Sequence, residues 1–102
     1  MSNLTTRIAL RDQFLTHLRE LSQHRDERPD IVDTSYGPEP AFVLWEAEQM
    51  LDLVNRIRAE AERPPATLEE VLRIERGASG HSDYRHKYAL RCAFLVLGEN
   101  RP

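Results

Sequence analysis

The sequence predicts an all-α protein, a small bundle of about four helices folded as a single domain over residues 1–102. Three observations support this prediction. A chain of 102 residues can bury one modest core. Its apolar residues recur at helical spacing, and the alternation typical of strands is almost absent. A hydrophobic fraction of 40% beside 30% charged residues is typical of a folded globular chain and not of a disordered one.

The first helix is expected over residues 4–23. Its apolar residues fall within an arc of about 160° when they are projected at 100° per residue; they are Leu4, Ile8, Leu10, Phe14, Leu15, Leu18 and Leu21. Residues 25–40 contain Pro29, Gly37, Pro38 and Pro40, and we expect a long loop there. Loops of that length are usually functional or mobile.

The second helix is expected over residues 41–62, ending before Pro64 and Pro65. Its apolar residues cover about 200° by the same projection. An arc that wide needs neighbours on two sides, so this should be the central helix.

Two shorter helices should follow, over residues 68–76 and 83–97. Thr67 and Glu70 have the spacing of a capping box, and Gly77 is expected to end the third helix. Ser82 is the expected N-cap of the fourth helix, and Gly98 its stop. Residues 88–97 are apolar nearly all round, so this helix is either wrapped by the others or half buried in a second copy.

Charged residues interrupt two of the apolar arcs. Glu46 projects into the middle of the arc of the second helix, and Arg7 and Arg11 lie inside the arc of the first. Burying a lone carboxylate costs several kcal/mol, so we expect a structural ion pair of Glu46 with Arg7 or Arg11. The alternative is that Glu46 lines a pocket as an acid or base, but Glu48 points about 160° away and no second titratable group is evident at the same depth.

The segment 76–91 is the candidate binding site. Gly77 and Gly80 permit a close backbone approach, and hydroxyl and basic side chains surround them. The candidate residues for an anion or a partner are Arg76, Gly80, His81, Ser82, Arg85, His86 and Lys87. Asp83 would repel a phosphate and no Walker pattern is present, so a plain connector is an equal alternative.

The same segment carries Tyr84 and Tyr88 one helical turn apart, beside Arg85 and Lys87, a combination that also occurs in nucleic-acid-binding proteins. The acidic isoelectric point of about 5.8 counts against nucleic acid. The glycine-rich turn is also longer than a helix-turn-helix requires. We therefore expect the tyrosines to bury their rings in the core.

No metal site and no cofactor are expected. His17 and His24 lie two turns apart on a helix, about 10.5 Å along its axis, which is too far for one ion without a further element. His81, Asp83 and His86 lie partly in a loop with no fixed geometry. Neither Cys92 nor any serine has a nucleophile motif around it, so catalysis is uncertain and less expected than binding.

The net charge of −3 is unevenly distributed, with basic ends and an acidic middle over residues 26–70. Such blocks can recognise a charged partner or attract one another across the fold. The longest apolar run, residues 92–97, is too short to span a bilayer, and the first residues lack a signal-peptide core. With Cys92 as its one cysteine, the chain is expected in the cytoplasm.

These observations predict a cytoplasmic, non-catalytic interaction module that binds another protein or itself as a homo-oligomer. The reason is the amount of apolar surface on the second and fourth helices. One alternative is nucleic-acid or phosphate binding through residues 76–91. The least expected alternative is a metal-dependent or acid-base enzyme using Glu46 or the histidines.

Overall fold

The computed structural model describes residues 4–35 and 37–99. In chain order these residues form α1 (Leu4–Leu21), the 3-10 helix η1 (Ser22–Glu27), β1 (Ile31–Thr34), β2 (Gly37–Pro40), α2 (Ala41–Glu60), α3 (Leu68–Ala78) and α4 (Tyr84–Leu97). The four predicted helices are present, and the all-α prediction is confirmed. No helix within the described ranges combines the length and the apolar content that crossing a bilayer would require.

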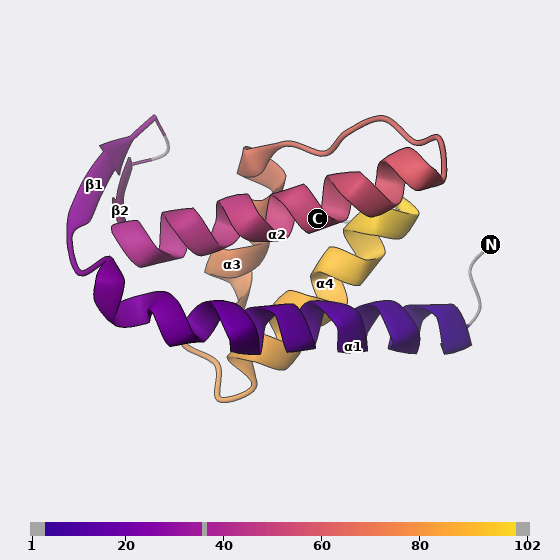
Figure 1. Cartoon of the computed structure of the whole chain (residues 1–102), viewed down its shortest axis with the longest axis horizontal. Helices are drawn as coiled ribbons and strands as arrows, with labels where there is room; N and C mark the ends of the chain where they lie inside the picture. The colour runs from indigo at the N-terminus through magenta and orange to yellow at the C-terminus, as the bar shows by residue number, and fades with distance from the viewer. Residues whose placement is uncertain (1–3, 36, 100–102) are drawn as a thin grey trace.

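The two long helices, α1 and α2, lie along the molecule and run in opposite directions, with the β1–β2 hairpin at the end where α1 finishes and α2 begins (Figure 1). α4 contacts α1, α2 and α3. Every helix contributes to one core, whose largest fully buried side chains are Phe14, Leu18, Met50, Val54, Val71, Leu72, Tyr88 and Cys92.

The apolar fourth helix is covered within the chain. Its buried residues are Tyr88, Ala89, Cys92, Ala93, Leu95 and Val96. The other three helices therefore wrap α4, which is the first of the two arrangements expected for this helix. The large apolar side chains that stay exposed are on other elements, and they are Leu4, Ile8 and Ile31.

The helix ends follow the capping signals in part. The capping box at the start of α3 is confirmed, since Thr67 Oγ1 accepts from the Glu70 amide at 3.3 Å and the Glu70 carboxylate accepts from the Thr67 amide at 3.0 Å. Gly98 ends α4 with φ 73°, a left-handed conformation that suits glycine. Gly77 does not end α3, which continues to Ala78.

The N-cap of α4 also needs correction. Asp83, not Ser82, occupies that position, and no side chain makes a cap hydrogen bond there. A stabilising cap was expected from Ser82 because serine is favoured before a helix. The helix begins one residue later, so the Ser82 hydroxyl belongs to the preceding turn.

The expected long loop over residues 25–40 is wrong in part. The first helix passes directly into η1, and β1 and β2 form an antiparallel pair in which Val32 pairs with Glu39 and Thr34 with Gly37. Four-residue strands are too short to show alternation, and prolines argue against a strand unless it lies at an edge. In a two-stranded sheet every strand is an edge, so Pro38 and Pro40 are tolerated in β2.

Candidate functional site

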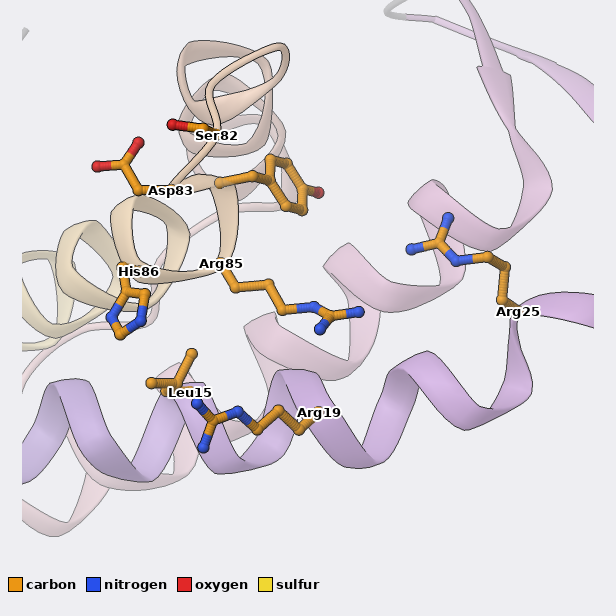
Figure 2. Close-up of a pocket in the computed structure, with 8 residues that line it drawn as sticks. Leu15, Arg19, Arg25, Ser82, Asp83, Arg85 and His86 are labelled. Carbon is orange, nitrogen blue, oxygen red and sulfur yellow. The ribbon is translucent and has the colours of Figure 1, made fainter.

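A hollow of about 410 Å³ lies where the end of α1, η1 and the start of α4 meet. We call it the arginine pocket. It is lined by Leu15, Arg19, Arg25, Ser82, Asp83, Tyr84, Arg85 and His86. Arg85 extends from the first turn of α4 in the direction of η1, the Arg25 guanidinium turns from η1 toward the start of α2, and Arg19 lies along α1 with its guanidinium beside Leu15 (Figure 2).

The three arginines of this pocket are not held in ion pairs. Among the described residues, neither Arg19, Arg25 nor Arg85 takes part in an ion pair. Arg25 instead stacks on Phe42, with its guanidinium carbon 4.3 Å from the ring centroid. The carboxylate of Asp83 points away from the three guanidinium groups (Figure 2). Three like charges that line one hollow favour the binding of an anion there.

Two buried carboxyl groups lie behind the pocket wall, joined by a tyrosine. The Tyr84 hydroxyl lies 3.1 Å from Glu75 Oε2 and 3.4 Å from Glu46 Oε1. Glu46 is 2% exposed and Glu75 is 6% exposed. We call Glu46, Glu75 and Tyr84 the acid cluster. Tyr84 belongs to both the acid cluster and the pocket lining, so it connects them.

A single proton completes the hydrogen bonding of the acid cluster. A hydroxyl group donates once, so Tyr84 serves one ionised carboxylate at a time. When Glu46 is protonated, its carboxyl O–H donates to the Tyr84 oxygen, and the tyrosine O–H donates to Glu75. The Glu46–Tyr84 contact and the Tyr84–Glu75 contact then each have one donor and one acceptor.

Burial dominates the acidity of this cluster. Removal from water raises the pKa of Glu46 to about 7, with the positive charge of Arg25 opposing the rise and Glu75 adding to it. Burial also raises the pKa of Glu75, and hydrogen bonding from Tyr84 opposes that rise. The pKa of Tyr84 is raised as well, first by burial and then by the two carboxylates. Tyr84 therefore stays a hydrogen-bond donor at neutral pH.

Tyr88 lies beneath this cluster, 5.8 Å from Tyr84 between ring centroids and completely buried. Its hydroxyl has no hydrogen-bond partner within the described part of the chain. The expectation that both tyrosines bury their rings is met for Tyr88, whereas Tyr84 is half-buried at the pocket wall.

The expected ion pair of Glu46 with Arg7 or Arg11 is not formed. Arg7 lies 2.5 Å from Glu99, and Arg11 pairs with the neighbouring Asp12 at 2.9 Å. The burial of Glu46 follows from its helical phase, as expected. Its neighbours differ because α1 and α2 run in opposite directions, so the first turns of α2, which include Glu46, follow the hairpin at the end of α1 (Figure 1). Arg25 is consequently the arginine whose charge acts most on Glu46.

The structure divides the predicted binding segment between several places. Ser82, Arg85 and His86 line the arginine pocket. Arg76 points elsewhere and pairs with Glu39 of β2 at 2.5 Å. The remaining candidates, Gly80, His81 and Lys87, are outside the pocket lining, and Gly80 makes the turn between α3 and α4 with φ 85°.

Sequence reasoning missed Arg19 and Arg25 as site residues. They are about 60 residues from Arg85 in the chain, and no local motif marks them. Arg19 lies outside the apolar arc of the first helix, where an arginine is common and does not indicate a site. The convergence depends on how α1 packs against α4, which helical periodicity does not determine.

Other candidate sites are weaker. A second hollow of about 530 Å³ between α1 and α2 is lined by Asp12, Glu20, His17, Arg56 and four other residues, so its charges are mixed. Within residues 4–35 and 37–99 no three His, Cys, Asp or Glu side chains are grouped to hold a metal ion. His24 Nδ1 lies 2.6 Å from Glu27 Oε2, so one ring nitrogen of this histidine already has a partner.

Comparison of the chain with protein-family models, with curated proteins and with solved structures gave no significant match.

Proposed function

We propose that this chain is a non-catalytic binding domain that holds an anionic group, carried by a ligand or by a partner protein, in the arginine pocket. The observation that carries the proposal is the set of three guanidinium groups around one hollow without an acidic partner among the described residues. Arginine is the side chain best suited to oxyanions, because its planar fork donates two parallel hydrogen bonds.

A phosphate group fits this pocket better than a carboxylate does. One bidentate arginine satisfies a carboxylate, whereas three arginines match the larger charge and the additional oxygens of a phosphate. Ser82 adds a hydroxyl donor and His86 adds an imidazole at the rim. The volume of about 410 Å³ leaves room for a small group attached to the phosphate.

An extended nucleic acid is less well supported than a single phosphate group. Nucleic-acid affinity grows with the number of phosphates neutralised along the strand, which needs a long basic surface. Arg76 does not extend the positive charge of the arginine pocket, because it forms an ion pair with Glu39. The chain as a whole is acidic, with a net charge of −3.

An acid-base enzyme is also less well supported. The pKa of Glu46 is raised to about 7, but Glu46 is 2% exposed and does not line the pocket. A general base must come within hydrogen-bond distance of the proton it removes from a substrate.

The proposal is tested by titrating the protein with inorganic phosphate, with sulfate and with acetate, using calorimetry at low ionic strength. Phosphate and sulfate should bind more tightly than acetate. Replacing Arg25 and Arg85 together with alanine should weaken sulfate binding roughly 10- to 100-fold, because each charge-assisted hydrogen bond to an anion is among the stronger ones.

A matched control removes the same charge elsewhere. Arg73 and Arg91 are exposed and do not line the pocket. The double variant Arg73→Ala/Arg91→Ala should bind sulfate nearly as the parent does. Equal weakening in both double variants would mean that only net charge matters, and the pocket assignment would fail.

Self-association is a second candidate function, supported by one observation. Leu4 and Ile8 lie one helical turn apart on α1 and are 68% and 40% exposed. We propose that this face pairs two copies of the chain, which would bury both side chains. We also propose a cytoplasmic location, which the buried, unpaired thiol of Cys92 supports.

The self-association proposal predicts a concentration-dependent dimer. Light scattering over a concentration series should show a rising mean mass for the parent and a constant monomer mass for Leu4→Ala/Ile8→Ala. A monomer at every concentration of the parent would end the idea.

A further inference from the structure

The acid cluster lies where anion binding in the arginine pocket can change the charge of a buried carboxyl group. Tyr84 forms part of the pocket wall, and its hydroxyl lies 3.4 Å from Glu46 inside the core. Arg25 and Arg85 line the same pocket and also act on the charge of Glu46. Two of the three arginines that would hold an anion are thus the groups that favour the ionised form of Glu46.

The charged and titratable groups around Glu46 come from three elements. Arg25 comes from η1 and favours ionisation, while Glu75 comes from α3 and opposes it. α4 supplies Tyr84 and Arg85, and its Tyr88 and Cys92 lie within range of the carboxylate charge of Glu46. Glu39 of β2 acts on Glu75, and Arg76 partly offsets it.

We infer that the arginine pocket binds its anion together with one proton, and that the Glu46 carboxyl group takes up this proton from solvent. The inference rests on the proposed function, since it concerns the same pocket. When an anion binds the guanidinium groups of Arg25 and Arg85, these groups keep their charge, but the negative charge of the anion offsets their field at Glu46. The Glu46 carboxylate is then less stabilised, so the neutral carboxyl becomes the favoured form.

The hydrogen bonding of the acid cluster favours the same result. Once protonated, Glu46 donates to Tyr84, and Tyr84 donates to Glu75, so that no carboxylate in the cluster lacks a donor. The pKa of Glu46, raised by burial to about 7 in the free protein, leaves this carboxyl partly ionised near neutral pH. A proton can therefore be gained there under ordinary conditions.

This coupling has a defined sign. Proton uptake on binding makes the affinity fall as pH rises, over the range where Glu46 is ionised in the free protein and protonated in the complex. That range begins near pH 7 and extends upward. Each pKa unit by which the anion raises the pKa of Glu46 makes binding about tenfold weaker above the range than below it.

The test uses sulfate, which keeps both charges between pH 6 and 9, so any proton exchanged belongs to the protein. Binding is measured by calorimetry at pH 7.5 in two amine buffers of different ionisation enthalpy, because amine buffers do not compete for an anion site. The parent should take up a fraction of a proton per sulfate bound, and its affinity should fall as pH rises.

Two variants assign the proton to its site. Glu46→Gln keeps an amide that can donate to Tyr84, so it should bind sulfate without proton uptake. His86→Gln removes the imidazole that lines the pocket, and this variant should still take up the proton at whatever affinity it retains. Uptake that persists in Glu46→Gln, or that disappears in His86→Gln, overturns the inference.

The parent protein gives a second measurement that needs no variant. The carbon-13 shift of the Glu46 carboxyl, followed over pH by NMR, should show a higher titration midpoint with sulfate present than without it, and an unchanged midpoint overturns the inference. Sulfate binding without proton uptake overturns the inference and leaves the proposed function standing. An absence of sulfate binding overturns both.

Discussion

Replacing Phe14 with alanine should lower the free energy of unfolding by about 3–5 kcal/mol, the largest effect expected from a single change in this chain. Phe14 is completely buried and belongs to the core that all four helices share. Truncation to alanine removes the transfer free energy of the ring and leaves a cavity that the packed helices close only in part. Urea denaturation followed by circular dichroism measures the change.

The control for Phe14→Ala is Ile31→Ala on β1. Ile31 is 71% exposed, so little apolar surface is returned to water when it is shortened. Its free energy of unfolding should stay within about 0.5 kcal/mol of the parent. Similar losses in the two variants would show that α1 does not pack on the core through the face that contains Phe14.

Replacing Glu46 with glutamine should make the protein more stable at pH 8 by about 2–4 kcal/mol while changing it little at pH 5. The pKa of Glu46 is raised by burial from 4.5 to about 7 in the folded chain. The folded state therefore binds more protons than the unfolded state between these two values. The stability that the protonated carboxyl contributes is complete below pH 4.5 and is lost as pH rises through 7.

Urea denaturation at pH 5, 6, 7 and 8 measures this effect as the difference between parent and variant, which cancels the titration of all other groups. Glu48→Gln is the matched control, because Glu48 lies on the same helix and is exposed. Its difference from the parent should stay within about 0.5 kcal/mol at every pH. A Glu46→Gln difference that does not grow between pH 5 and pH 8 would contradict the burial of an ionisable Glu46.

Helical periodicity and capping chemistry predicted the four helices because both are local. The starts of α2 and α3 follow from Pro40 and from the capping box at Thr67. The hairpin of β1 and β2 was missed because its stability comes from cross-strand pairing, which four residues of sequence do not reveal. Local signals also placed the start of α4 one residue too early, because serine and aspartate are both good N-caps.

The candidate site was predicted only in part, for the same physical reason. Helical phase states which face of a helix is buried, and it placed Glu46 in the core correctly. Helical phase does not determine the direction of the neighbouring helix. The arginine beside Glu46 was therefore expected near the start of the first helix, at Arg7 or Arg11, and not at Arg25 after its end. Ser82, Arg85 and His86 were found because they lie together in sequence, whereas Arg19 and Arg25 reach them only through packing.

The register of the hairpin determines how this protein meets other β-structure. Pro38 and Pro40 have no N–H, and the amides of Gly37 and Glu39, which alternate with them, face β1. The free edge of β2 therefore offers carbonyl groups but no donors, and a further strand cannot form a complete ladder there. Strand-by-strand growth of the sheet is therefore blocked on the β2 side, which removes one of the two edges of this hairpin as a template for aggregation.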